Sequence, residues 1–123
     1  MRTYTGGCHC GRVRFELTTD LARVVACNCS ICTRKGYLHH IVPPERFRLL
    51  AGAEVLATYR FGTGTARHHF CRQCGVASFY VPRSHPDHVD VNVRCLDGVD
   101  PAALRPEPFN GREWEASIGT LTV

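Results

Sequence analysis

Seven of the eight cysteines lie in three short clusters, and their spacing within each cluster is typical of metal sites. The clusters are Cys8–Cys10 (C-x-C), Cys27–Cys32 (C-x-C-x2-C) and Cys71–Cys74 (C-x2-C). A C-x-C or C-x2-C turn brings two thiolates to one ion at a Zn–S distance of ~2.3 Å. Two such turns complete a tetrahedron, whereas C-x-C-x2-C supplies three ligands alone. The spacing therefore predicts two zinc ions per chain, in two different kinds of site.

The simplest assignment pairs the first cluster with the third. It predicts a closed four-cysteine cluster, made of Cys8, Cys10, Cys71 and Cys74. It also predicts an open three-cysteine cluster, made of Cys27, Cys29 and Cys32. Closed four-ligand zinc sites stabilise folds, whereas sites with three protein ligands and one free position carry out chemistry. We therefore expect a structural zinc in the four-cysteine cluster and a reactive zinc in the three-cysteine cluster.

The charge of the three-cysteine cluster limits its chemistry. Three thiolates around Zn²⁺ leave a net charge of about −1, which makes the ion a poorer Lewis acid than a three-histidine site. A soft, sulfur-rich site favours an incoming thiol, bound as the nucleophilic thiolate. Such a thiolate can add to an electrophilic carbon of a second reactant. The fourth thiolate needs nearby cations, and Arg34 and Lys35 are candidate charge partners because they follow Cys32 closely.

Other polar residues are weaker candidates. His39 or His40 could provide a fourth ligand or a proton shuttle, but alternate residues of a strand face opposite ways, so at most one can face the metal. Cys95 follows a patterned strand and is expected to be a small buried side chain, although it could complete the three-cysteine cluster. Trp114, the only tryptophan, is expected to be a core or lid aromatic, and a pocket role is the alternative.

Two other assignments of the cysteines remain open. The pairs Cys29/Cys32 and Cys71/Cys74 could form one C-x2-C…C-x2-C ribbon, a non-enzymatic zinc module that binds a thiol, an aldehyde, a protein or nucleic acid. That assignment leaves three clustered thiols unexplained. An iron–sulfur site on the three-cysteine cluster lacks a fourth cysteine at a normal spacing.

Length and composition indicate one domain, residues 1–123, in a reducing compartment. The chain shows no apolar leader and no apolar run of the ~18 residues that a membrane span requires, so we expect a cytoplasmic protein with reduced thiols. The net charge of +4 comes from fourteen scattered Arg and one Lys. Because a nucleic-acid surface is more often a basic stripe with exposed aromatics, nucleic acid is an unlikely partner. The oligomeric state is not predictable from these features.

The elements expected around the clusters are mostly strands, since apolar residues alternate and no long 3.6-residue period occurs. Residues 33–36 are expected to be a polar loop, 45–50 is undecided between helical turn and strand, and 62–65 is a hairpin turn. One helical turn is expected at 100–104, followed by a loop-rich tail. The predicted strands are residues 12–18, 23–26, 37–42, 54–61, 66–70, 76–81 and 89–93. The predicted fold is mainly β, with antiparallel sheets.

In these motifs the chain resembles the glutathione-dependent formaldehyde-activating enzyme family, which also includes centromere protein V. The resemblance is carried by four segments in the family's order and spans nearly the whole chain. They are Gly6-Gly7-Cys8-His9-Cys10-Gly11-Arg12-Val13-Arg14-Phe15, Cys27-Asn28-Cys29-Ser30-Ile31-Cys32-Thr33-Arg34-Lys35-Gly36, His69-Phe70-Cys71-Arg72-Gln73-Cys74-Gly75 and Val91-Asn92-Val93-Arg94-Cys95-Leu96-Asp97.

The resemblance implies a β-tent fold of packed antiparallel sheets, with hairpins held by zinc and one or two short helical turns. It implies a structural zinc on the four-cysteine cluster and an active-site zinc on the three-cysteine cluster. The implied activity is that of a carbon–sulfur lyase, the S-(hydroxymethyl)glutathione synthase reaction of glutathione with formaldehyde. This chain departs from the family at Asn28, where members often have His.

Overall fold

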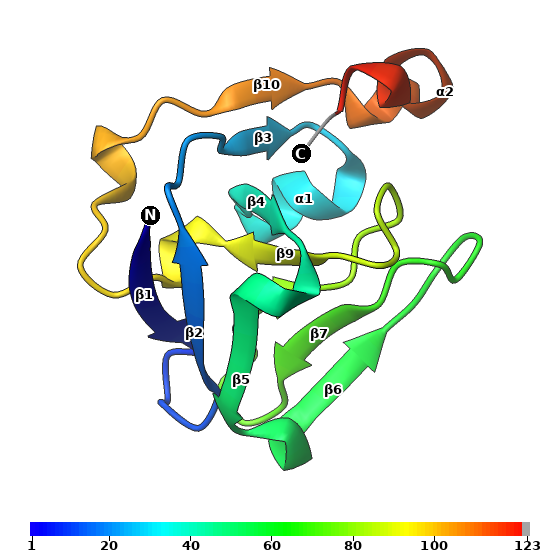
Figure 1. Cartoon of the computed structure of the whole chain (residues 1–123). Helices are drawn as coiled ribbons and strands as arrows, with labels where there is room; N and C mark the ends of the chain where they lie inside the picture. Colours follow the sequence, from blue (N-terminus) through cyan, green and yellow to red (C-terminus); the bar gives the residue numbers. More distant parts are fainter. Residues whose placement is uncertain (122–123) are drawn as a thin grey trace.

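The computed structural model describes residues 1–121 and consists mainly of short strands in three sheets (Figure 1). A three-stranded sheet has the order β1-β2-β5, a five-stranded sheet the order β10-β3-β4-β9-β8, and β6 pairs with β7. The strands are β1 Arg2–Gly7, β2 Arg14–Thr19, β3 Val25–Cys27, β4 His39–Val42, β5 Phe47–Ala51, β6 Leu56–Tyr59, β7 His68–Cys71, β8 Phe79–Tyr80, β9 Val89–Asn92 and β10 Glu107–Phe109. The pairs are antiparallel except for β10 with β3, which is parallel. The predicted mainly β, antiparallel fold is confirmed.

The helices are short and lie at the ends of strands. α1 is Ser30–Lys35 and α2 is Trp114–Ser117. The 3-10 turns are Pro44–Arg46, Ala53–Val55, Val93–Cys95, Pro101–Ala103, Gly111–Glu113 and Ile118–Thr120. No helix among residues 1–121 has the length and apolar character needed to cross a membrane.

Aromatic side chains join the sheets into one core. Phe15 of β2 is fully buried, with ring centroids 5.1 Å from Phe47 of β5 and 6.0 Å from Phe79 of β8. Phe79 also packs against His69 of β7 at 5.6 Å. Val13, Phe15 and Leu17 are completely buried, as the alternating pattern of this segment predicted. Because this core contacts every sheet, it fixes the strand ends that carry the cysteines.

Three sequence predictions need correction, and one strand was not predicted. Residues 33–36, expected to be a loop, form the end of helix α1 and its C-cap, Gly36, at φ 64° in the left-handed region. The tail contains β10 and α2, not only loop. The predicted apolar face of 54–61 is not buried, since Tyr59 and Phe61 are exposed and stack on each other 5.5 Å apart. Strand β1 was not predicted, because only Gly6 and Gly7 at its end are buried.

Other predictions agree within a few residues. The undecided segment 45–50 is a 3-10 turn followed by β5. The helical turn expected at 100–104 is the 3-10 turn Pro101–Ala103, and Asp100 caps it by accepting a hydrogen bond from the Ala102 N–H at 3.0 Å. The predicted strand 37–42 begins two residues late, at β4.

Candidate metal centres and cavity

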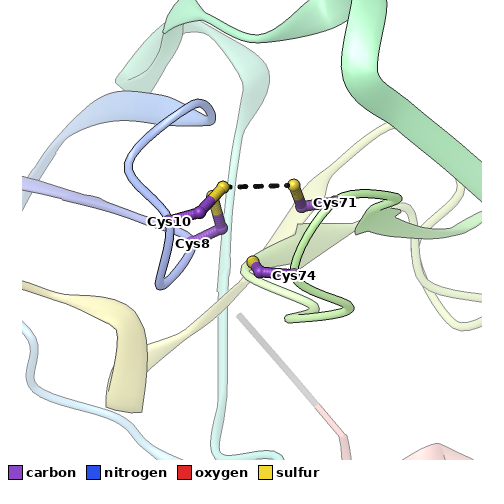
Figure 2. Close-up of side chains that lie close together, drawn as sticks. All are labelled: Cys8, Cys10, Cys71 and Cys74. Atoms are coloured by element: carbon purple, nitrogen blue, oxygen red, sulfur yellow. Dashed lines mark hydrogen bonds between the residues drawn. The ribbon is translucent and has the colours of Figure 1, made fainter.

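The four-cysteine cluster joins the loop after β1 to the turn after β7 (Figure 2). The Cys8 and Cys10 sulfurs lie 3.6 Å apart, the Cys10 and Cys71 sulfurs 3.7 Å apart, and all four lie within 4.8 Å of one another. Tetrahedral zinc with Zn–S bonds of ~2.3 Å separates its sulfurs by about 3.8 Å. The Cys8–Cys10 and Cys10–Cys71 separations match this geometry, and all four sulfurs are close enough together to share one zinc ion.

Hydrogen bonds favour the charged form of Cys10 in this cluster. Arg12 donates hydrogen bonds from its backbone and its side chain, which lower the pKa of Cys10 to about 6. The Cys8 sulfur accepts a hydrogen bond from the Val13 N–H at 3.3 Å. The Arg12 donors stabilise the thiolate of Cys10, and thiolate is the form that binds metal.

The three-cysteine cluster is built where β3 meets α1. Cys27 ends β3, Cys29 is the N-cap of α1, and Cys32 lies in its first turn. Their sulfurs lie within 4.8 Å of one another. Mutual hydrogen bonds lower the pKa of Cys29 to about 2 and raise the pKa of both Cys27 and Cys32. The three thiols thus compete for one negative charge, and a soft cation such as zinc would let all three ionise.

The structure separates the two C-x2-C pairs. Cys29 and Cys32 belong to one cluster, whereas Cys71 and Cys74 belong to the other. This contradicts the ribbon assignment, which requires all four sulfurs around one ion. Cys95 belongs to neither cluster; burial raises its pKa first of all, and the charges that add to the shift come from Cys8 and Cys74 of the four-cysteine cluster. Cys95 therefore does not complete the three-cysteine cluster.

A cavity of about 600 Å³ opens beside the three-cysteine cluster. Its walls include apolar residues and three arginines, at positions 34, 83 and 112. Apolar walls exclude water, while cations balance the charge of several thiolates. The cavity can thus hold a small molecule that carries both sulfur and negative charge.

The segment around Gly111 forms the wall nearest the cysteines. A Cβ at Gly111 would lie 2.4 Å from the Cys27 sulfur and 3.1 Å from the Cys29 Cβ. Asn28 fixes this wall: its side-chain amide donates to Asn110 Oδ1 at 2.9 Å and accepts from the Arg112 N–H at 3.0 Å. Arg112 Nε also donates to the Asn28 carbonyl at 2.7 Å. The residue that departs from the family pattern therefore binds the C-terminal segment.

Two buried residues lie behind the cluster: His39, one of the two candidate histidines, and Asp90, which the sequence did not indicate. His39 Nε2 lies 3.1 Å from the Cys32 sulfur, and His39 Nδ1 lies 2.7 Å from Asp90 Oδ2. Asp90 is 1 % exposed, and its Oδ1 has no hydrogen-bond partner. His40 faces the other way, 2.8 Å from Thr19 Oγ1, as strand alternation requires. His39 and Asp90 can orient Cys32, as outer partners of metal ligands commonly do.

Arg34 and Lys35 differ in their surroundings. Arg34 is exposed, lines the cavity, and donates to the Ser30 carbonyl at 3.1 Å. Lys35 is half-buried, and its ammonium lies 3.2 Å from His68 Nδ1. Burial lowers the pKa of Lys35, although the nearby Cys32 and Asp90 charges oppose that shift. Lys35 is therefore within electrostatic reach of the thiols, while its hydrogen bond goes to His68.

Trp114 lines the cavity, so the pocket role that was the alternative prediction for this residue is the one observed. Its ring meets Phe109 edge-on at 6.3 Å, and the Arg83 guanidinium lies 4.2 Å above it. Trp114 thus helps to hold Arg83 beside the cavity.

The chain is similar to known proteins in sequence and in fold. The family model for the glutathione-dependent formaldehyde-activating enzyme matches residues 3–112. A Halomonas elongata protein, provisionally named after the same enzyme, is 28 % identical over 101 residues. That match covers 75 % of this chain but only 64 % of the Halomonas protein. A Rhodobacter sphaeroides protein of known crystal structure is 42 % identical in sequence to this chain. The two structures superpose with a TM-score of 0.77, and the match covers 85 % of this chain and 97 % of that one.

Proposed function

Because the chain belongs to the glutathione-dependent formaldehyde-activating enzyme family, we propose that it joins a small thiol to a small aldehyde in the cavity beside its three-cysteine cluster. Glutathione and formaldehyde are the pair that the family name indicates, and their adduct is S-hydroxymethylglutathione. In the reverse direction this is a carbon–sulfur lyase reaction. The proposal takes residues 1–123 as one domain acting in the reducing cytoplasm, where its thiols stay free for metal.

The observation that carries the proposal is the placement of three thiols in the wall of a cavity with cationic residues. Cys27, Cys29 and Cys32 would hold one zinc ion and the four-cysteine cluster a second, which makes two per chain. Zinc at the three-cysteine cluster would supply a soft position at which a substrate thiol ionises.

The residues of the chain provide the remaining requirements. The apolar walls keep water from the aldehyde, and the wall arginines balance the added thiolate. Lys35 does not line this cavity, but its charge acts on the nearby Cys32 and Cys29. His39 and Asp90 orient Cys32 through their shared hydrogen bonds. Attack by the substrate sulfur on the aldehyde carbon then requires that both reactants lie together in the cavity.

The first test is thiol binding in protein whose zinc has been replaced by cobalt. Glutathione should strengthen the sulfur-to-metal charge-transfer band, and S-methylglutathione, which has no ionisable thiol, should not. Cys32→Ser should abolish the response, while Cys95→Ser is a matched control because Cys95 lies outside both clusters. Absence of any response in protein that holds two metals would refute the open site.

The second test is turnover. With formaldehyde added, the hydroxymethyl thioether should form faster than in a protein-free control, as followed by NMR. Thiol binding without acceleration would instead support the alternative function, that of a non-enzymatic zinc protein which binds a thiol or an aldehyde.

A further inference from the structure

His68 stands between the three-cysteine cavity and a second, smaller cavity. The first cavity is lined by the cysteines and His68, whereas the second is lined by Lys35 and His68. The His68 ring lies flat between two aromatic rings, 5.4 Å from Phe61 and 4.7 Å from Tyr80, at interplanar angles of 21° and 12°. The imidazole therefore has a fixed plane and contacts both spaces.

The hydrogen bond from Lys35 determines which ring nitrogen carries the proton. An ammonium group has three donors and no acceptor, so His68 Nδ1, 3.2 Å from Lys35 Nζ, must accept. In the neutral ring the proton is then on Nε2. Burial and the charge of Lys35 lower the pKa of His68 to about 4, which keeps the ring neutral near pH 7.

The Nε2 atom is available to a ligand. Within residues 1–121 it makes no hydrogen bond, and the only fully enclosed side-chain nitrogen or oxygen without a partner is Asp90 Oδ1. His68 Nε2 is therefore not fully enclosed, although the side chain as a whole is only 5 % exposed. With Nδ1 turned to Lys35, this N–H is the one polar group of the ring left for a ligand, and His68 lines the first cavity.

From this geometry we infer that His68 is a catalytic residue that donates its Nε2 proton to the aldehyde oxygen, and that Lys35 is the residue that positions it. The inference rests on the proposed function and adds to it the group that receives the developing negative charge. Neutral imidazole donors of this kind act where charge appears in the transition state.

The protons of this step balance among Lys35, His68, the substrate and the solvent. The substrate sulfur forms the carbon–sulfur bond, and the carbonyl π electrons move to oxygen. The Nε2 proton passes to that oxygen while a Lys35 proton passes to Nδ1, leaving a neutral amine. The proton lost earlier by the thiol then returns to Nε2 from solvent, and Nδ1 gives its proton back to Lys35.

The first experiment measures the tautomer directly in the zinc-loaded wild-type protein. Two-dimensional ¹⁵N NMR of the imidazole ring at pH 7 should show a neutral His68 with the proton on Nε2. Lys35→Met should produce a mixture of tautomers, a change that a purely structural lysine would not cause. A proton on Nδ1 in the wild type, or an unchanged tautomer in Lys35→Met, would overturn the inference.

The second experiment measures adduct formation. His68→Phe keeps a flat ring but removes the N–H, so the rate should fall about 100-fold while the thiol dissociation constant stays within about twofold. His68→Gln, which retains an N–H, should recover part of the rate. His69→Phe is the matched control, because His69 Nδ1 instead pairs with Thr58 Oγ1 at 2.8 Å, outside the cavity lining.

The possible results separate the two proposals. If the wild type accelerates the reaction and His68→Phe accelerates it equally, the role of His68 is refuted and the proposed function stands. If the wild type does not accelerate the reaction, the proposed function and the role of His68 both fail.

Discussion

Replacing Gly111 by alanine should weaken metal binding at the three-cysteine cluster alone. The added Cβ would lie 2.4 Å from the Cys27 sulfur, whereas non-bonded heavy atoms normally stay about 3.5–4.0 Å apart. Either the sulfur or the wall must therefore move by roughly 1 Å. Metal–ligand distances tolerate only about 0.2 Å. Gly111 lies outside the positive-φ region, so alanine there introduces no backbone strain that could confuse the result.

Movement of the wall is opposed by the hydrogen bonds that Asn28 makes with Asn110 and Arg112. The strain therefore falls largely on Cys27, and we expect zinc affinity at this cluster to drop about 10- to 100-fold, as for other changes next to metal ligands. Gly119→Ala is the matched control, because a Cβ there meets nothing within 4 Å.

The assay is competition with a chromogenic chelator, which resolves the two zinc ions by their rates and affinities. In Gly111→Ala the weaker zinc should leave at lower chelator concentration, and the tighter zinc of the four-cysteine cluster should be unaffected. Equal zinc binding at both clusters in Gly111→Ala and wild type would refute the close approach of this wall to Cys27.

Three further predictions concern the clusters and the buried groups. Cys71→Ser should lower the melting temperature severely, since structural zinc contributes ~10–16 kcal/mol to folding in small peptides. Cys29→Ser should leave a folded protein with one zinc. Equal losses of melting temperature in calorimetry would contradict the division between the sites. His68 should titrate near pH 4 by NMR. Because its pKa in the folded protein lies below the ordinary 6.5, its contribution to the free energy of unfolding should be lost as the pH falls from about 6.5 to about 4. A titration midpoint near 6.5 would show that the ring is not enclosed as described. Cys95, whose pKa burial raises to about 11, should resist iodoacetamide at pH 8 in the native protein and react after denaturation, as mass spectrometry would show.

The cysteine partition could be predicted from sequence because ligand spacing is a local property. A C-x-C or C-x2-C turn places its own sulfurs together whatever the rest of the chain does, so only the pairing between turns had to be inferred. The strands with alternating burial, such as the segment with Val13, Phe15 and Leu17, were predictable for the same reason. Helix α1 was not, because six residues with one buried side chain show no helical period.

The groups around the cavity depend on strand register, which the sequence does not display. His39 meets Asp90 because β4 pairs with β9 over residues about fifty apart. His68 meets Lys35 because β7 brings it beside the end of α1. Arg34 and Lys35 were candidate charge partners of the cysteines because they lie close to Cys32 in the sequence. In the structure, Arg34 donates its hydrogen bond to the Ser30 carbonyl, and Lys35 is paired with the His68 imidazole, a contact that no local sequence pattern indicates.

The four-cysteine cluster joins segments that the ribosome releases far apart in time. Its first pair is complete at Cys10, yet the second pair follows only after a loop of about sixty residues, which contains the whole three-cysteine cluster. Closing a flexible loop of that length costs about 3.6 kcal/mol of chain entropy, far less than the ~10–16 kcal/mol that structural zinc can contribute. A nascent chain emerging without metal would therefore expose three thiols of the later cavity inside an unclosed loop. Zinc supply during synthesis, and not only after it, should set the yield of folded protein.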